Sequence, residues 1–346
     1  MVAAICKEIE LQQDFFANKD LVIQTIYFGG GTPSLLSAGD IDAILLKIRA
    51  CFKVDDNAEI TLEANPDDVD LTKLLALKKM GINRLSIGIQ SFMDEDLIWM
   101  NRAHRAQSAV DAIELAKKAG IHNISIDLIY GVPTLSDANW IFNINKAIAL
   151  EVQHLSCYAL TVEPKTALQA FIAKGTKEDI DPAKQAAHFD ILLALATKAG
   201  FEQYEFSNFA LQGYRSKHNT SYWQQKKYLG IGPSAHSFTG NNRQWNIANN
   251  ALYISSIEKG TVPHESELLS ATTQYNEYLM TSLRTIEGCS LAYINEKYGA
   301  AALARTKSIA QKYITQEQLI MEGNYLRATK KGKFFLDGIA ADFFEV

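Results

Sequence analysis

Hydrophobic residues recur along the chain at two different spacings, which predict helices and strands in alternation. Two stretches place apolar residues on one helical face: Ile41, Ile44, Leu45, Ile48 and Phe52, and Ala109, Ala112, Ile113 and Ala116. Short apolar runs predict strands over residues 25–28, 59–63, 84–90, 123–129 and 154–161. A steady alternation of strands with helices is typical of a parallel α/β sheet.

A short sequence repeats with a period near forty residues. Lys-Lys-Met-Gly-Ile at 78–82 and Lys-Lys-Ala-Gly-Ile at 117–121 each precede an apolar run, and Lys-Ala-Gly-Phe at 198–201 precedes Tyr-Glu-Phe at 204–206. Each glycine stands where a helix is expected to end, a place that favours a left-handed backbone. The repeat favours a TIM-like barrel, although the period alone leaves an open doubly wound sheet as an alternative. A predicted helix over 2–16 comes first, without the strand that should precede it in such a barrel.

From about residue 265 the pattern changes to helices. The spacing predicts helices over 265–286, 291–298 and 303–313, extended segments over 319–322 and 325–328, and a last helix over 332–343. Helices followed by a small hairpin resemble a winged-helix-like module, and a helical cap on the barrel is an equally good interpretation. The two patterns predict two domains, a partial barrel over 1–240 and a helical, winged-helix-like domain over 241–346.

Composition narrows the classes of partner. The chain has 346 residues, 47% hydrophobic and 21% charged, with a net charge of −5 and a pI near 5.9. This acidic balance argues against a nucleic-acid partner, and Lys330, Lys331 and Lys333 are expected to be a solvated face. No apolar run is long enough to span a membrane, which still allows a peripheral contact, and charges within 1–16 are unlike a signal peptide. We therefore expect a cytoplasmic protein whose four scattered cysteines are free thiols.

Polar and glycine residues follow the predicted strands at their carboxyl ends, where ligands bind in parallel α/β folds. Gly29–Gly31 follow the first strand and allow close backbone approach and positive φ, although a tight structural turn explains such a run equally well. Glu63 ends the second strand, where it can bind ammonium or hydroxyl groups of a ligand or pair with a neighbouring Lys or Arg side chain. Gln90, Arg102 and Asp127 stand at or after later strands. Together these residues outline a polar pocket on one rim of the sheet.

Four segments, in this order, resemble successive motifs of one radical S-adenosylmethionine (SAM) family: Gly-Gly-Gly-Thr-Pro at 29–33, Glu-Ala-Asn-Pro at 63–66, Arg-Leu-Ser-Ile-Gly-Ile-Gln-Ser-Phe at 84–92 and Ile-Asp-Leu-Ile-Tyr-Gly-Val-Pro at 126–133. This family contains oxygen-independent coproporphyrinogen III oxidase and its haem-chaperone relatives. The resemblance covers nearly the whole chain. It implies a partial (β/α)6 barrel, here without its first strand, with SAM lying across its top.

The resemblance also implies two sets of ligand residues. The residues that match the family's SAM-binding positions are Gly30, Gly31, Thr32, Glu63, Gln90, Arg102, Asp127 and Ala159. His-Asn-Thr-Ser-Tyr-Trp at 218–223 resembles the haem-chaperone signature, which implies haem binding by His218, Asn219, Tyr222 and Trp223. A histidine beside Tyr and Trp is by itself more often a packed core residue, but imidazole can ligate haem iron while rings pack on the macrocycle.

The family's Cys-x-x-x-Cys-x-x-Cys motif, whose thiolates bind a [4Fe–4S] cluster, does not occur in this sequence. Cys6, Cys51, Cys157 and Cys289 lack its spacing and are interpreted as structural thiols, so we expect no metal ligand and no SAM cleavage by this chain. Two explanations stay open. Either Met1 is an internal methionine of a longer protein, or the chain is a variant without radical chemistry. The persistence of the SAM-pocket residues favours the first.

The resemblance implies a function with one alternative. The chain would be a radical SAM-family haem chaperone that binds SAM and haem and delivers haem to recipient haemoproteins. The alternative is an oxygen-independent coproporphyrinogen III oxidase-like enzyme of porphyrin biosynthesis. The segment at 218–223 favours the chaperone.

Overall fold

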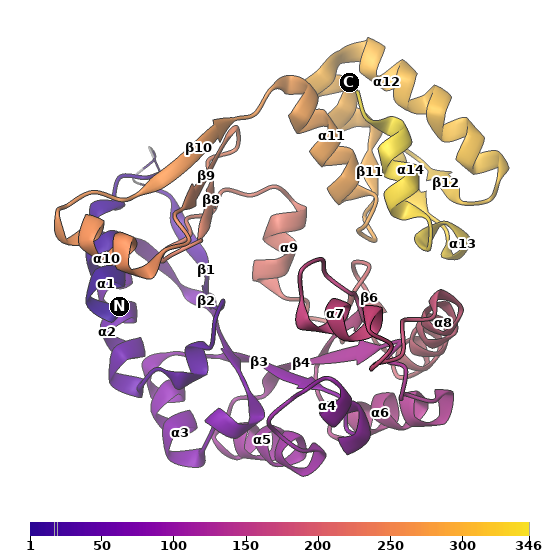
Figure 1. The fold of residues 1–346 in the computed structure, drawn as a ribbon. Coiled ribbons are helices and arrows are strands. Elements are labelled where there is room, and N and C mark those ends of the chain that lie inside the picture. The colour runs from indigo at the N-terminus through magenta and orange to yellow at the C-terminus, as the bar shows by residue number, and fades with distance from the viewer. Residues whose placement is uncertain (17, 19, 346) are drawn as a thin grey trace. The chain divides into compact units, whose positions relative to one another are not determined.

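The computed structural model describes residues 1–16, 18 and 20–345 (Figure 1). Its chain separates into two compact units, each built from several segments. The first unit comprises Met1–Gln24, Gly39–Ala58 and Lys217–Val346, and the second comprises Thr25–Ala38 and Glu59–Ser216. The domain boundary expected at residue 240 stays a prediction.

A seven-stranded sheet curls into a half-barrel, which confirms the expected α/β fold class. In spatial order the strands are β1 (Val22–Phe28), β2 (Lys53–Ala64), β3 (Arg84–Gln90), β4 (Asn123–Tyr130), β5 (His154–Ala159), β7 (Asn208–Ala210) and β6 (Glu202–Gln203). Strands β2 to β5 pair in parallel, whereas β7 pairs antiparallel with both β5 and β6. The five expected strand regions are therefore present, although β2 begins six residues before its expected start at 59.

In-register pairing sorts the side chains of these parallel strands into rows. One row crosses the sheet on the side of the helices and is fully apolar; this apolar row is Ala64, Ile87, Ile126 and Leu155. The neighbouring row, on the opposite face, is polar; this polar row is Glu63, Ser86, Ser125 and His154. Because side chains alternate along a strand, each parallel pairing extends both rows by one residue.

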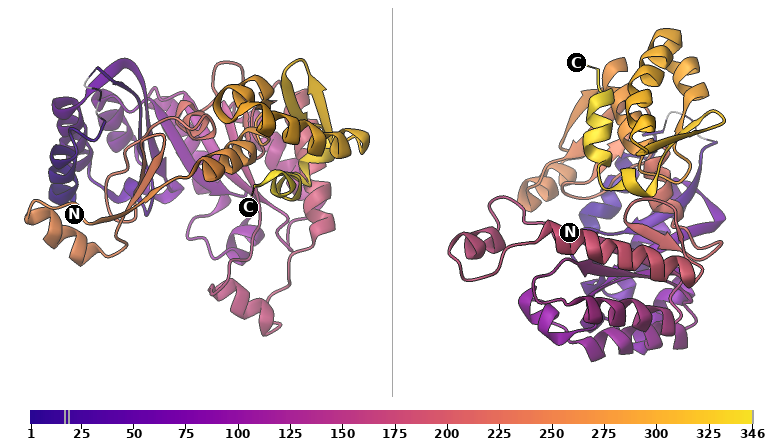
Figure 2. Two further views of the ribbon diagram at one scale, coloured as in Figure 1. Left: turned by 90° about the horizontal axis from the view of Figure 1, so that it is seen from above. Right: turned by 90° about the vertical axis from the view of Figure 1, so that its right-hand side faces the viewer.

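Helices cover the apolar face of the sheet, as Figure 1 and Figure 2 show. They are α3 (Leu71–Met80), α5 (Ala106–Lys118), α6 (Asp137–Ala149) and α8 (Pro182–Lys198). The short helices η1 (Pro33–Leu35), η2 (Pro66–Asp68), α4 (Asp94–Trp99) and α7 (Ala167–Ala173) lie in the connections. The glycines of the repeat have left-handed φ values of 107° at Gly81, 81° at Gly120 and 87° at Gly200, as expected for helix ends. The apolar stripe of α5 is buried as predicted.

The first unit holds two small antiparallel sheets with their helices. The helices are α1 (Val2–Leu11), α2 (Ala38–Cys51), α9 (Lys217–Trp223), α10 (Asn250–Glu258), α11 (Ala271–Ser282), α12 (Leu291–Thr315), α13 (Lys330–Lys333) and α14 (Leu336–Phe343). One sheet contains β8 (His236–Phe238), β9 (Asn242–Asn246) and β10 (His264–Leu268). The other contains β11 (Cys289–Ser290), β12 (Leu319–Glu322) and β13 (Tyr325–Ala328). The hairpin expected at 319–328 is therefore present.

Three expected elements are wrong in detail. Residues 264–268 form β10 rather than the start of a helix, because this exposed segment pairs along its length with β9. Residues 204–206 are not a strand but the turn that joins the antiparallel β6 and β7. The opening helix ends at Leu11, five residues before its expected end. By contrast, Gly299 with φ 87° interrupts α12 near the gap between the two helices expected there.

Within the part of the chain that the structure describes, no helix has the length and apolar character needed to cross a bilayer.

A buried carboxylate, Glu8, holds α1 inside the first unit. It is fully inaccessible and accepts hydrogen bonds from Gly232 N at 2.7 Å, from Asn246 Nδ2 at 2.6 Å and from the Tyr253 hydroxyl. Burial raises the pKa of Glu8, against the effect of these three donors. Such a carboxylate costs free energy to bury and is stable only while its donors remain in place.

Glu8→Ala is expected to lower the free energy of unfolding by about 3 kcal/mol, because it leaves three buried donors without an acceptor. Urea denaturation measures the change. Glu10→Ala on the exposed side of the same helix is the matched control and should shift stability by less than about 0.5 kcal/mol. Equal stability of the two variants would contradict the role of Glu8.

Candidate functional site

Glu63, the member of the polar row that lies at the carboxyl end of its strand, is the centre of the candidate site. Glu63 ends β2 and is half-buried, and both of its oxygens accept hydrogen bonds. The Tyr27 hydroxyl donates to Oε1 at 2.6 Å, and Gly30 N donates to Oε2 at 3.2 Å. The glycine loop after β1 is therefore joined directly to Glu63. Tyr27 was not among the expected site residues.

Asp127 lies on β4, on the same face as Glu63. The residue is half-buried. This burial, followed by the negative charge of Glu63, raises the pKa of Asp127 to about 7, while a hydrogen bond from Ser156 and the charges of Arg84 and Arg102 act in the opposite direction. At neutral pH the Asp127 carboxyl can therefore both donate and accept hydrogen bonds.

Gln90 and Arg102 meet above Gly88. A Cβ at Gly88 would lie 3.1 Å from Gln90 Nε2 and 3.5 Å from Arg102 Nη2, so the two side chains approach the strand where only glycine leaves room. Arg102 Nη2 lies 3.4 Å from the Gly88 carbonyl and 3.5 Å from Asn65 Oδ1. Gln90 itself has a left-handed φ of 68° where β3 ends, a conformation that is uncommon outside glycine.

The remaining expected residues have fewer contacts with this group. Gly30 and Gly31 have φ values of 75° and 63° and face open space. Thr32 precedes the short helix η1. Ala159 ends β5 opposite Tyr130 of β4. The structure thus bonds Gly30 to Glu63, places Glu63 near enough to Asp127 to act on its charge, and brings Gln90 and Arg102 to the same glycine.

These residues suit a ligand that carries an ammonium group and hydroxyls, as SAM does. Two neighbouring carboxyl groups attract a cation, a partly protonated Asp127 can pair with hydroxyls, and an open glycine loop permits close approach of a ligand to the backbone.

The described residues do not present a set of ligands for an iron–sulfur cluster. Over residues 1–16, 18 and 20–345, no three His, Cys, Asp or Glu side chains converge as metal ligands, and all four cysteines are free thiols.

The expected haem segment forms α9 in the first unit. The His218 ring meets the Tyr222 ring edge to face with centroids 4.9 Å apart, and Tyr222 meets Tyr228 at 4.6 Å. Tyr222 is 42% exposed, whereas His218, Asn219 and Trp223 are half-buried. Trp223 Nε1 is buried without a hydrogen-bond partner among the described residues. The segment therefore combines an imidazole, aromatic rings in edge-to-face contact and an unused donor.

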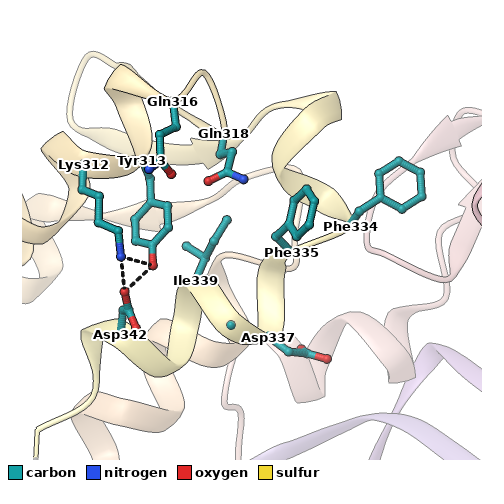
Figure 3. Close-up of a pocket in the computed structure, with 10 residues that line it drawn as sticks. Lys312, Tyr313, Gln316, Gln318, Phe334, Phe335, Asp337, Ile339 and Asp342 are labelled. Atoms are coloured by element: carbon teal, nitrogen blue, oxygen red, sulfur yellow. Dashed lines mark hydrogen bonds and ion pairs between the residues drawn. The ribbon is translucent and has the colours of Figure 1, made fainter. Parts of the chain in front are cut away.

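A hollow of about 540 Å³ in the first unit was not expected from the sequence (Figure 3). Lys312 Nζ lies 2.7 Å from Asp342, and the Tyr313 hydroxyl donates to the same carboxylate. Phe335 and Ile339 line its other side. Lys312, Tyr313 and Asp342 already satisfy one another.

Asp127→Asn is expected to stabilise the protein more as the pH rises. The pKa of Asp127 is about 7 in the folded chain and near 4 when unfolded, so the folded form retains a proton that the unfolded form has already lost between these values. The native aspartate therefore lowers the free energy of unfolding, and this loss grows from pH 4 to pH 7. Asparagine, which does not titrate, removes the loss. Urea denaturation should show a gain of about 1.5 kcal/mol at pH 5 and about 4 kcal/mol at pH 8.

Asp111→Asn, on the exposed face of α5, is the control for this titration and should change stability little at either pH. An Asp127→Asn gain that is the same at both pH values would contradict the raised pKa.

Known proteins resemble the chain over both of its sequence patterns. Residues 6–143 match the radical SAM superfamily, and residues 269–335 match the HemN C-terminal domain. The heme chaperone HemW of Bacillus subtilis is 36% identical over 80% of this chain and 74% of its own length. The heme chaperone HemW of Escherichia coli is 32% identical over 95% of this chain and 86% of its own.

A solved structure shares the fold. Coproporphyrinogen III oxidase (HemN) from Escherichia coli matches with a TM-score of 0.83 over 99% of this chain and 82% of that one, at 20% sequence identity. That likeness supports the half-barrel and the helical tail, and the sequence identities to the chaperones identify the family more narrowly. The chain belongs to the haem chaperone HemW family of the radical SAM superfamily.

Proposed function

We propose that this chain binds haem at α9 and delivers it to recipient haemoproteins. The observation that carries the proposal is the aromatic array of His218, Tyr222 and Tyr228, in a chain whose relatives are named heme chaperones. A chaperone must hold haem firmly enough to capture it and loosely enough to release it. A single imidazole ligand allows capture of haem, and a half-exposed aromatic surface that does not enclose the macrocycle allows its release.

Each residue of α9 has a role in this proposal. His218 supplies an axial nitrogen to the haem iron. The ring of Tyr222, perpendicular to the imidazole at 87°, limits how the histidine can turn and offers an exposed face to the macrocycle. The buried Trp223 Nε1 is a donor that a haem propionate can satisfy once the helix adjusts. Asn219 adds a polar side chain next to the ligand.

We also propose that the pocket of the second unit binds SAM. Glu63 accepts hydrogen bonds from the ammonium group, Asp127 pairs with hydroxyls, and Gln90 with Arg102 bounds one side. The backbone of Gly30, Gly31 and Thr32 approaches the methionine end, and Ala159 leaves space at the end of β5. When bound, SAM supplies the activated sulfonium on which the chemistry of the superfamily depends. We assign no step to a [4Fe–4S] cluster.

The alternative is a coproporphyrinogen III oxidase-like enzyme. The structural likeness to HemN supports it, but at 20% identity this likeness concerns the fold alone. The relatives at 31–36% identity are named heme chaperones, and this favours the first proposal. The four free thiols support a reducing compartment, and we therefore propose that the protein is cytoplasmic. Independently, we propose a boundary between two domains near residue 240.

His218→Ala is expected to weaken haem binding about tenfold or more with little change in stability, because the half-buried imidazole is the proposed iron ligand. Haem titration followed by absorbance measures the affinity, and a shift of the Soret band reports the lost ligand. His122→Ala, at an exposed histidine far along the sequence, is the control and should bind haem like the wild type. Unchanged binding by His218→Ala would place the haem elsewhere.

Glu63→Ala is expected to weaken SAM binding by about tenfold, because the cationic methionine end loses its carboxylate partner. Asp127→Ala should also weaken it. Isothermal titration calorimetry gives the dissociation constants, and Glu114→Ala on the exposed face of α5 serves as the charge-matched control. If both pocket variants bind SAM like the wild type, these carboxylates are structural only.

A further inference from the structure

Tyr27, Gly29 and Glu63 pack as one group. A Cβ on Gly29 would lie 2.4 Å from Tyr27 Cε1 and 3.0 Å from Glu63 Oε1, distances at which the ring and the carboxylate would both have to move. At Gly30 and Gly31 the same added atom meets nothing within 4 Å, and the need for glycine comes from positive φ instead. The first glycine of the loop is therefore required by the contact between Tyr27 and Glu63.

This contact fixes the direction of the Glu63 side chain. Tyr27 holds Oε1 and Gly30 N holds Oε2, so rotation about the terminal bonds of Glu63 breaks at least one hydrogen bond. Burial, followed by the charge of Glu63, raises the pKa of Tyr27 far above its ordinary value, so the hydroxyl keeps its proton and remains a donor.

A competing partner for Glu63 is present on the neighbouring strand. Arg84 lies two residues before Ser86, the residue paired with Glu63, and so it belongs to the same face of the sheet. Arg84 is 2% exposed, and its Nε is buried without a hydrogen-bond partner among the described residues. A buried guanidinium with an unused donor attracts any carboxylate that can turn toward it.

We infer that Tyr27 is a positioning residue, which holds Glu63 toward the ligand pocket and prevents it from pairing with Arg84. The inference rests on the proposed SAM pocket and deepens it: the held carboxylate is the one that receives the ammonium group of an amino-acid-bearing nucleoside. Besides Tyr27, the charged groups that act on this region are Asp127 on β4, Arg84 on β3 and Arg102 after α4.

Tyr27→Phe tests the inference, because it removes the hydroxyl and keeps the ring. Tyr130→Phe is the matched control, since Tyr130 belongs to the same sheet but packs against Trp140 on the helix-covered face. Two probes are titrated by calorimetry: SAM, which carries the ammonium group, and 5′-methylthioadenosine, which lacks the amino-acid part. Tyr27→Phe should bind SAM about tenfold more weakly and methylthioadenosine within about twofold of wild type.

A ligand-free measurement adds a second readout. The Gly30 amide loses its fixed acceptor when Glu63 turns away, so its proton resonance should shift and exchange faster with solvent in Tyr27→Phe but not in Tyr130→Phe. Gly29→Ala should reproduce both effects, because its methyl group displaces Tyr27 and Glu63 together.

The outcomes separate the inference from the proposed function. Equal weakening of both ligands in Tyr27→Phe would mean a general structural defect and would overturn the positioning role. Unchanged SAM affinity would overturn it as well. If the wild-type chain binds neither ligand, the proposed SAM pocket itself fails, and the inference fails with it.

Discussion

The in-register pairing of parallel strands is the constraint on which the second unit depends. It gathers the apolar row on the face that the helices cover and the polar row on the other face. The apolar row is dry and supplies the core. A buried polar side chain needs a hydrogen-bond partner, so the members of the polar row either pair internally, as Ser125 and His154 do, or remain available to a ligand. The candidate site follows from this division of the two faces.

The charges on the polar face of the sheet determine which of its side chains remain available to bind a ligand. His154 is fully enclosed, and burial with the nearby Arg84 lowers its pKa, so it is neutral and bonded to Ser125 and Tyr204. Arg84 contributes one positive charge beneath two carboxyl groups, of which Asp127 is partly protonated at neutral pH. Arg102 adds a second positive charge near Asp127, so two guanidinium groups oppose the two carboxyl groups. Of these groups, Glu63 is a half-buried carboxylate with acceptor capacity left for a ligand that arrives from solvent.

Each unit contains a carboxylate that is partly or fully removed from water, and the two carboxylates differ in how many protein donors surround them. In the first unit Glu8 is buried and closed by three donors from the protein, so nothing is left for a ligand. In the second unit Glu63 is only half-buried, and its two hydrogen bonds leave acceptor capacity on both oxygens. Glu8 is therefore structural and Glu63 is suited to binding, because Glu8 has three protein donors and is enclosed whereas Glu63 has two and is half-exposed.

The sequence alone determined the strand and helix periods, the polar strand ends and the family motifs, because these depend on local spacing. It thereby located Glu63, Asp127 and the segment at 218–223. Only the tertiary structure decided which side chains meet. Tyr27 and Glu63 are 36 residues apart, and their contact depends on how neighbouring strands lie side by side. The antiparallel return of β7 and the pairing of β10 were hidden for the same reason, since spacing along a chain does not encode the partner across a sheet.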